Sequence, residues 1–229
     1  MTKYYSDSLS GNRLKLCYEL APPRVLQYLK EEINFVRKRI KPGHLILELG
    51  CGYGRVLKEL LFKPELLVGI DNSMKSLQFG KKSFLKSDNT ALVCMDAKNL
   101  GFIDKKFDLV FCIQNGISAL GIEPELLVQE ALRITKPNGK LILSSYSDKF
   151  WEVRLSWFQI QSENGLVGEI DYSVTGDGII ICKDGFRATT FNKNQFDKLL
   201  LEFGNKYKIY EIDESSIFCE IVAGSKNQG

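Results

Sequence analysis

The chain has 229 residues, of which 44% are hydrophobic and 26% are charged, and its formal net charge is +3 at pH 7. This composition excludes a largely disordered chain, and the length favours one core with one insertion over two domains. Basic residues are scattered among acidic ones, which gives a nucleic acid partner little support, and no apolar stretch suits a signal peptide or membrane span, which predicts a cytoplasmic protein.

Residues 1–40 are expected to form a helical lid or cap. Residues 1–21 mix polar and aromatic side chains and predict a short helix or a flexible lead. Pro22 and Pro23 end that segment, and Pro23 suits the first turn of a second helix. The second helix has six apolar side chains on one face, which should pack on a sheet: Val25, Leu26, Leu29, Ile33, Val36 and Ile40.

The segment from Leu45 to Leu61 predicts a strand, a glycine loop and a helix. An apolar run reaches an acid, Glu48, and three glycines then stand at alternate positions. An amphipathic pattern begins at Val56. Glycine is needed where the backbone has positive φ, or where a ligand approaches more closely than a Cβ permits. A nucleotide-like ligand is therefore the first hypothesis for this loop.

Strands and helices alternate without interruption as far as Ser145. Continuous apolar runs are typical of buried parallel strands, and the alternation predicts a doubly wound parallel sheet with right-handed crossovers. Lys136–Gly139 predicts a tight turn before the fifth strand. The expected strands are Leu45–Leu49, Leu66–Ile70, Ala91–Met95, Phe107–Ile113 and Lys140–Ser145, with helices from Asn72 to about Phe84 and from Pro124, where Leu126, Leu127, Ala131, Leu132 and Ile134 turn inward.

After Tyr146 the pattern changes, and residues 151–191 are expected to form an inserted subregion on the substrate side. Trp151–Phe158 predicts a helix. Leu166–Thr190 alternates strand-like segments around glycine-containing turns, which predicts a β-hairpin or a small β-meander.

The last part of the chain predicts a helix and a hairpin. Asn192 and Gln195 resemble a capping box for a helix that ends at Gly204. Two apolar segments then follow, Tyr207–Ile212 and Ile217–Ala223, and the short polar turn between them predicts that they pair as closing strands.

Polar side chains follow four of the predicted strands, at the point where each strand ends. In a doubly wound sheet, ligands bind beyond the carboxyl ends of the strands, at the switch point beside the first strand. Four strand ends therefore face one cleft, and they carry Glu48 with the glycines, Asp71, Asp96, and Gln114 with Asn115.

The spacing of the glycines argues against a dinucleotide. A dinucleotide fingerprint has glycine at its first, third and sixth positions, and the sixth position counted from Gly50 is Arg55. No Gly-Lys-Ser/Thr sequence follows for a phosphate-gripping loop. With an acid before Gly-x-Gly-x-Gly, the sequence resembles the class I S-adenosylmethionine-dependent methyltransferases over about Lys41–Ser145. The closing hairpin is similar to that family's final two strands.

The resemblance implies a single methyltransferase domain over residues 1–229 with a Rossmann-like α/β fold. Its sheet would be doubly wound, mostly parallel and seven-stranded, with a C-terminal antiparallel hairpin and, in this chain, a small β insertion. The implied cofactor is S-adenosylmethionine, and the implied reaction is methyl transfer to a small-molecule acceptor by in-line displacement.

The resemblance assigns the first two strand ends to the methionine and ribose parts of the cofactor. Gly50, Gly52 and Gly54 would let the backbone lie against these parts. Glu48 would contact the amino acid end directly or through water. Asp71 would accept hydrogen bonds from both ribose hydroxyls, which suits a carboxylate with two acceptor oxygens.

The remaining strand ends are assigned to the adenine and to the side that faces the acceptor. Asn72 follows the ribose acid and is placed in the same cofactor site. Asp96 with Ala97 matches the acidic motif that meets the adenine amino group. Gln114 and Asn115 match the motif between cofactor and substrate.

Several of these residues also have a structural interpretation. The strand-terminal acid Asp71 can serve as a helix cap, Asp96 as a loop acid, and Gln114 with Asn115 as simple turn formers. A glycine loop joined to two correctly ordered acids nevertheless favours cofactor binding. His44, the only histidine, precedes the first strand and is therefore expected at the opposite edge, in a surface or structural role.

The sequence names no catalytic residue. Alignment and a dry site are the protein's main contribution to this displacement, and core or surface roles are favoured for the conceivable contributors, Tyr5, Tyr18, Tyr146 and Asp148. The fourth strand ends in Gln-Asn-Gly-Ile, which lacks the Asp/Asn-Pro-Pro-aromatic signature of enzymes that methylate exocyclic amines of bases. The six cysteines contain no Cys-x-x-Cys pair, and no metal is predicted. Three of them lie in or beside apolar strand-like runs, where a small reduced hydrophobic side chain is expected.

The identity of the acceptor stays open at this level. Aromatic side chains of the insertion are expected to form either an acceptor pocket or a small core of its own; they are Trp151, Trp157, Phe158, Tyr172 and Phe186. Two other functions also remain open. One is a nucleotide-binding or regulatory module of the same fold without catalysis, and the other is a nicotinamide-dependent oxidoreductase.

Overall fold

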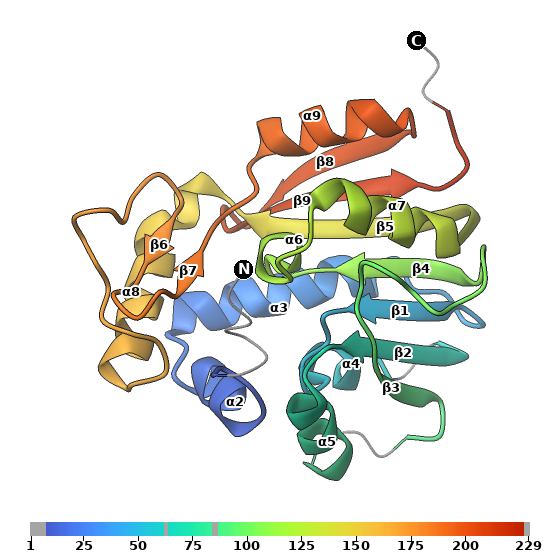
Figure 1. The fold of residues 1–229 in the computed structure, drawn as a ribbon. Coiled ribbons are helices and arrows are strands. Elements are labelled where there is room, and N and C mark those ends of the chain that lie inside the picture. The colour runs from blue at the N-terminus through green and yellow to red at the C-terminus, as the bar shows by residue number, and fades with distance from the viewer. Residues whose placement is uncertain (1–7, 62–63, 84–86, 227–229) are drawn as a thin grey trace.

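The computed structural model describes residues 8–61, 64–83 and 87–226. Within these ranges, helices and strands follow one another as Figure 1 shows. In chain order they are α2 (Asn12–Glu19), α3 (Pro23–Arg37), β1 (Leu45–Leu49), α4 (Arg55–Lys58), β2 (Leu66–Asp71), α5 (Met74–Ser83), β3 (Thr90–Cys94), β4 (Phe107–Cys112), α6 (Gly116–Ala119), α7 (Pro124–Ile134), β5 (Thr135–Tyr146), the 3₁₀ turn η1 (Asp148–Phe150), α8 (Trp151–Glu163), β6 (Ile180–Ile181), β7 (Arg187–Ala188), α9 (Lys193–Phe203), β8 (Tyr207–Ile212) and β9 (Ser216–Val222).

The main sheet has seven strands in the order β3-β2-β1-β4-β5-β9-β8. β1 pairs in parallel with β2 on one side and with β4 on the other, so Glu48 stands opposite Gly69 and Phe111. β9 runs antiparallel to both β5 and β8 and closes the sheet as a hairpin. The predicted fold, a doubly wound and mostly parallel sheet with a C-terminal antiparallel hairpin, is confirmed.

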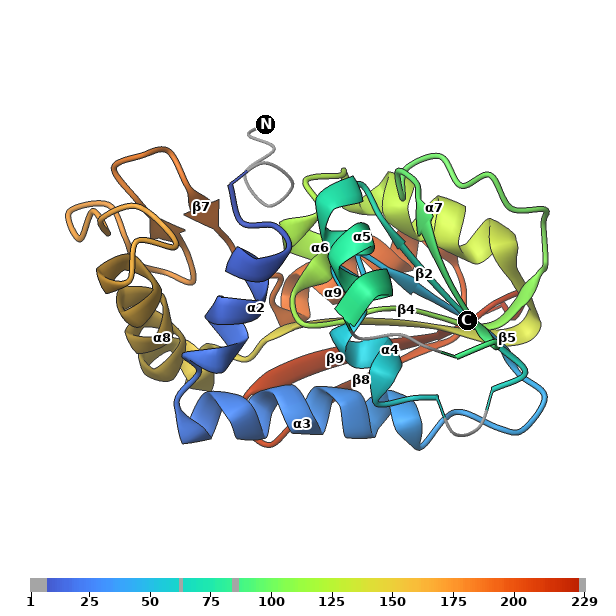
Figure 2. The ribbon, with the colours of Figure 1, turned by 90° about the horizontal axis from the view of Figure 1, so that it is seen from below.

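Helices cover both faces of the sheet, which gives three layers (Figure 2). Alternate residues of β1 face opposite layers, because side chains of a strand alternate between its two faces. Leu47 and Leu49 pack in the core under α7 and α9, and Ile46 packs in the core under α3 and α4. All three side chains are buried, as expected for a strand covered on both faces.

A second group of elements lies beyond the carboxyl ends of the parallel strands (Figure 1). α2 and α8 lie there with the two-residue strands β6 and β7, whose pairing forms the predicted small hairpin. One apolar cluster joins Leu9 and Cys17 of the N-terminal segment to Phe158 and Phe186 of the insertion. The N-terminal segment and the insertion therefore share a core at the edge of the sheet where ligands bind in this fold class.

Most predicted boundaries agree with the structure to within one or two residues, and the Asn192–Gln195 capping box at the start of α9 is present. The predicted turn at Lys136–Gly139 is wrong as a boundary, because it lies inside β5, where the pairing with β4 shifts register and Asn138 has φ 64°. Leu26 and Leu126 were assigned to buried faces but are 50% and 47% exposed. Each neighbours the true buried position, Val25 or Leu127, and lies about 100° around the helix from it.

All six cysteines have free thiols, and every one except Cys94 is buried. Within the described ranges, no three His, Cys, Asp or Glu side chains are grouped so that they could hold a metal ion. The helices of the same ranges all lack the length and apolar character needed to cross a membrane.

Candidate active site

A cavity of about 270 Å³ opens at the carboxyl ends of β1, β2 and β4. The glycine loop after β1 and the start of α5 form one side, and α6 and the β4 loop form another. α2 and α8 close the end that faces the insertion. The predicted cofactor residues that line this cavity are Glu48, Gly50, Gly52, Asp71, Asn72, Gln114 and Asn115.

The glycine loop turns away from β1 with a left-handed backbone. Gly50 and Gly52 have φ values of 74° and 55°, a region that side chains disfavour. A Cβ on Gly50 would lie 2.9 Å from Leu120 Cδ2, and a Cβ on Gly52 would lie 2.9 Å from Leu14 Cδ2. The loop therefore presents bare backbone to the cavity, and Leu120, directly after α6, and Leu14 of α2 cover it.

Glu48 lies one residue before the end of β1, with its carboxyl group in the cavity and only 4% of the residue exposed. Its Oε2 atom is buried and has no hydrogen-bond partner among the described residues. Burial raises the pKa of Glu48 to about 8, the Arg55 guanidinium opposes this rise, and the carboxylate of Asp71 adds to it. An unpaired buried carboxyl oxygen is costly, so this site is suited to a ligand that brings a hydrogen-bond donor or a positive charge.

Asp71 organises the backbone around the second strand end. Its Oδ2 accepts a hydrogen bond from Gly52 N at 2.8 Å, and its Oδ1 accepts one from Ser73 N at 2.8 Å. Burial raises its pKa, and these two hydrogen bonds work against the rise. Each carboxylate oxygen has a further lone pair. The structural interpretation of Asp71 and a ligand-binding role are therefore compatible.

The loop after β4 has a strained backbone that a buried acid supports. Gln114 has φ 58°, and its N–H donates to Glu32 Oε2 at 2.8 Å and to Ser144 Oγ at 2.9 Å. Ser144 Oγ in turn donates to the same Glu32 oxygen. Glu32 comes from α3 and is fully buried, and burial raises its pKa to about 7 against the effect of these hydrogen bonds. Glu32 thus fixes the backbone that points Gln114 into the cavity.

Asn115 connects the same loop to the insertion. Its φ is 63°, its Oδ1 accepts from Ser145 Oγ at 2.7 Å, and its Nδ2 donates to Thr189 O at 2.8 Å. Ser145 Oγ also accepts from Phe191 N at 2.8 Å. The side chain of Asn115 therefore has a structural role at the place where the sheet meets the insertion, although the residue lines the cavity.

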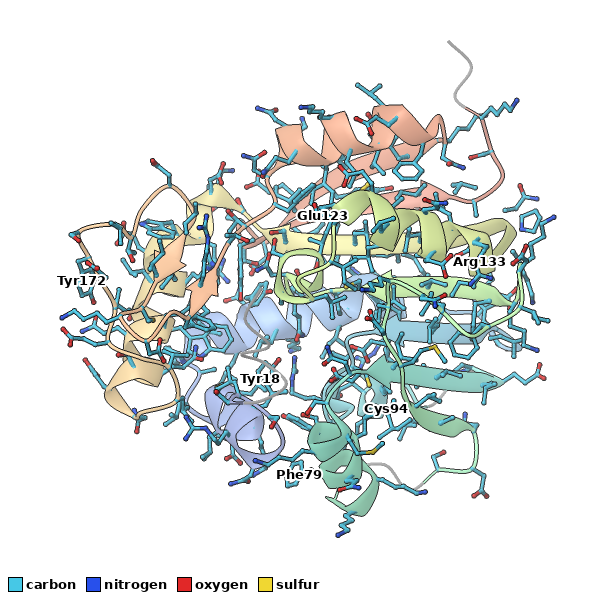
Figure 3. The ribbon with its side chains drawn as sticks, viewed as in Figure 1. Tyr18, Phe79, Cys94, Glu123, Arg133 and Tyr172 are labelled. Atoms are coloured by element: carbon cyan, nitrogen blue, oxygen red, sulfur yellow. The ribbon has the colours of Figure 1, made fainter. Side chains whose placement is uncertain are left out.

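Arg55 and Tyr18 are site residues that sequence reasoning did not assign to the cofactor. Arg55 Nη2 donates to Gln114 Oε1 at 2.5 Å, and its guanidinium carbon lies 4.2 Å from the centre of the Tyr18 ring. Tyr18 extends from α2 toward the strand ends (Figure 3). Arg55 Nε and Gln114 Nε2 are buried without partners in the described chain. In the sequence, the feature that indicated a site role for Arg55 was its position directly after the glycine loop.

Four residues of the sequence analysis lie away from the cavity. Gly54 has φ 82° and caps α4. Asp96 is exposed and its Oδ1 accepts from Lys98 N at 3.0 Å, while Ala97 is buried in the core. None of these three residues lines the cavity, and the adenine contact assigned to Asp96 and Ala97 stays a prediction. His44 precedes β1, at the edge of the sheet opposite the cavity.

The aromatic residues of the insertion divide between the two roles that the sequence left open. Trp157 and Phe158 line the cavity. Phe186 is fully buried in the core that the insertion shares with the N-terminal segment, and Trp151 packs against that core. Tyr172 is 59% exposed at the outer edge of the insertion (Figure 3).

The four residues that the sequence offered as conceivable bases also differ in their position relative to the cavity. Tyr18 and Tyr146 line the cavity, whereas Asp148 is exposed outside it and Tyr5 lies outside the described residues. Burial raises the pKa of Tyr146 to about 12, although the nearby Arg154 guanidinium lowers it. A phenol with so high a pKa stays protonated at neutral pH and cannot accept a proton, so the structure identifies no base for early proton removal among the three described residues.

Comparison with known proteins agrees with this geometry. A family model described as a methyltransferase domain matches residues 47–143. The malonyl-[acyl-carrier protein] O-methyltransferase of Marinomonas sp. is 29% identical over 161 residues, which are 67% of this chain and 54% of that protein. The demethylmenaquinone methyltransferase of Paenarthrobacter aurescens is 31% identical over 108 residues, which are 47% of this chain and 41% of that protein. The matches therefore span about half the length of these curated relatives.

A solved structure supports the fold over almost the whole chain. A protein from Pyrococcus horikoshii superposes with a TM-score of 0.64 at 18% identity, covering 97% of this chain and 99% of that one. The matched domain, residues 47–143, contains the glycine loop, Asp71 and the loop after β4. Residues 47–143 therefore form a methyltransferase domain, and the sheet order and this superposition show the fold of the class I S-adenosylmethionine-dependent methyltransferases.

Proposed function

We propose that this cavity binds S-adenosylmethionine and that the protein transfers its methyl group to a small-molecule acceptor by in-line displacement. The observation that carries the proposal is the buried, unpartnered Glu48 oxygen beside a glycine loop that presents bare backbone. A ligand that fits must bring a donor or positive charge to this oxygen and must lie close to Gly50 and Gly52. The methionine part of the cofactor, with its ammonium group, meets both requirements.

The charged and polar groups of the cavity match the remaining parts of the cofactor. The buried donors Arg55 Nε and Gln114 Nε2, which have no partners in the described chain, would receive its carboxylate. Asp71 would accept from the ribose hydroxyls with the lone pairs that Gly52 and Ser73 leave unused. Asn72 lies beside Asp71 at the same end of the cavity.

The rest of the cavity wall would align the acceptor and exclude water. When bound, the cofactor supplies the electrophilic methyl group on its sulfonium, so the protein mainly provides geometry and a dry site. We assign these tasks to the described part of residues 1–40, where α2 covers the glycine loop, and to residues 151–191, where α8 closes the opposite end.

The cofactor assignment is tested by titration calorimetry with S-adenosylmethionine, its demethylated product and NAD. We expect both sulfur compounds to bind and NAD to fail to displace them. Asp71→Ala should weaken their binding roughly tenfold or more, because at least one hydrogen bond to a charged group is lost. Asp88→Ala, a change of an exposed acid, is the matched control and should leave binding unchanged. Tighter binding of NAD would favour an oxidoreductase.

Catalysis needs a separate experiment, because a non-catalytic module of the same fold would pass the binding test. The protein is incubated with isotopically labelled S-adenosylmethionine and a metabolite extract, and labelled products are sought by mass spectrometry. A labelled small molecule that disappears with Glu48→Gln supports methyl transfer. Cofactor binding without any labelled product across a broad set of extracts would identify a binding module.

A further inference from the structure

One end of the cavity is lined mostly by apolar and aromatic side chains. They come from the N-terminal segment, the end of β5 and α8, three parts of the chain that meet only in the fold. We call this end the aromatic chamber, and the residues that define it are Leu9, Tyr18, Tyr146, Trp157, Phe158 and Gln161.

The aromatic chamber is enclosed and its walls are held in place. Trp157 and Phe158 are each 5% exposed, and Gln161 is 3% exposed. Trp157 Nε1 donates to Cys17 O at 3.0 Å, and the ring of Trp157 lies 6.3 Å from that of Tyr18, centre to centre. An acceptor that enters must shed its water and is surrounded by ring faces and edges, which favours a planar aromatic body.

The aromatic chamber has no ionised side chain of its own. In the described chain, the charged residues that line the whole cavity are Glu48, Arg55 and Asp71. The proposed function assigns all three to the cofactor, and Arg55 also lies against the Tyr18 ring at the boundary of the aromatic chamber. With Glu48 ionised by an ammonium partner, two carboxylates and one guanidinium give a net charge of −1. S-adenosylmethionine has two positive groups and one negative group, so the cofactor balances this charge and leaves none to compensate an ionic acceptor.

One further cation lies behind the wall of the aromatic chamber. The guanidinium carbon of Arg154 is 4.7 Å from the centre of the Tyr146 ring, and its Nη1 donates to Gly178 O at 2.8 Å. Arg154 is fully buried and does not line the cavity. The positive charge of Arg154 repels a cationic acceptor. The Tyr146 ring lies between Arg154 and the aromatic chamber, so an anionic acceptor would form no direct ion pair with Arg154.

We infer that the methyl acceptor is an uncharged, planar aromatic small molecule whose ring occupies the aromatic chamber. This inference rests on the proposed cofactor site. Gln161 supplies the polar contact that orients a ring substituent. Its Nε2 is directed to Trp157 O at 3.4 Å, and its carboxamide oxygen accepts no hydrogen bond from the described residues. Amines that are cationic at neutral pH and carboxylic acids are excluded, because each would bury an uncompensated charge.

The test compares three probes that share one ring system and differ in charge: 2-naphthol, 2-naphthoate and 2-naphthylmethylamine. Each is titrated calorimetrically into the protein saturated with an S-adenosylmethionine analogue in which a protonated amine replaces the sulfonium, so that the charge balance of the methyl donor is kept. We expect 2-naphthol to bind at least tenfold more tightly than either ion. Equal affinities, tighter binding of an ion, or no binding of 2-naphthol at millimolar concentration would overturn the inference.

Two variants show where the probe binds. Ala188 also lines this end of the cavity and is 6% exposed, so Ala188→Leu should fill the aromatic chamber and weaken 2-naphthol binding at least tenfold while demethylated cofactor binds as before. Tyr172→Ala, a change of an exposed residue of the same insertion, should alter neither affinity. Unchanged 2-naphthol binding by Ala188→Leu contradicts the location. If the unmodified protein did not bind the cofactor, the proposed function itself would be refuted. Failure of the acceptor inference and failure of the proposed function are therefore distinguishable.

Discussion

Replacement of Glu32 by glutamine should stabilise the protein at alkaline pH and leave it almost unchanged in acid. Glu32 is fully buried in α3, and its Oε2 accepts hydrogen bonds from Gln114 N and Ser144 Oγ. Its Oε1 has no hydrogen-bond partner among the described residues. Glutamine has the same shape as a protonated glutamic acid and can keep the two accepted hydrogen bonds, but it never acquires a charge.

The magnitude follows from the pKa of Glu32. Burial raises this pKa from 4.5 to about 7 in the folded protein, and one pKa unit corresponds to about 1.4 kcal/mol. The folded state therefore binds the proton more tightly than the unfolded state. The resulting stability is fully present below pH 4.5 and is lost as the pH rises to 7, up to about 3 kcal/mol. Glu32→Gln removes this loss.

The assay is urea denaturation of both proteins at pH 5 and pH 8. Comparing the two proteins at each pH isolates Glu32, because other titrating groups, such as Glu48, contribute equally to both. We expect Glu32→Gln to be more stable by roughly 1–3 kcal/mol at pH 8 and within about 1 kcal/mol at pH 5. Glu31→Gln, a change of the partly exposed neighbour, should show no such difference. The reasoning is refuted if Glu32→Gln is destabilised more at pH 8 than at pH 5.

Three further predictions concern the cofactor end of the cavity and its link to the insertion. Burial raises the pKa of Glu48 to about 8, and an ammonium partner favours its ionised form, so S-adenosylmethionine binding should strengthen from pH 6 to pH 8 and release close to one proton at pH 7. Calorimetry in buffers of different ionisation enthalpy measures this release, and a pH-independent affinity that Glu48→Gln does not alter would count against it. Gly52→Ala adds a Cβ 2.9 Å from Leu14 Cδ2 at φ 55° and should weaken cofactor binding more than tenfold with an unchanged circular dichroism spectrum, whereas normal affinity would show that the loop is not in the site. Asn115→Ala removes the hydrogen bonds to Ser145 and Thr189 and should lower the free energy of unfolding by about 1–3 kcal/mol in urea, a loss that an unaffected midpoint would contradict.

Much of the fold was predictable because local pattern and global architecture agree. The parallel strands are mostly apolar runs with polar residues at or near their carboxyl ends, and strand–helix alternation leaves few topologies. The site residues at the ends of β1, β2 and β4 were predictable for the same reason, since parallel strands bring their carboxyl ends to one edge. Glu48, Asp71 and Gln114 meet in one cavity although they are far apart in the chain.

The residues that sequence reasoning missed depend on packing between distant segments. Glu32 reaches the β4 loop only because α3 packs across the sheet. Its sequence signal was an acid on the buried helix face, four residues after the buried Tyr28. Arg55 was used to argue against a dinucleotide, and its contacts with Tyr18 and Gln114 require α2 to fold over the glycine loop. The burial of Leu26 was predicted wrongly, because periodicity alone did not separate it from Val25.

A crystal structure of the protein with the demethylated cofactor, S-adenosylhomocysteine, tests the central claim most directly. The account predicts that its amino group contacts the unpartnered Glu48 oxygen, that its ribose hydroxyls donate to Asp71, and that its sulfur points toward the aromatic chamber. Density for the ligand at another place, or in this cavity with its ribose away from Asp71, would contradict the account.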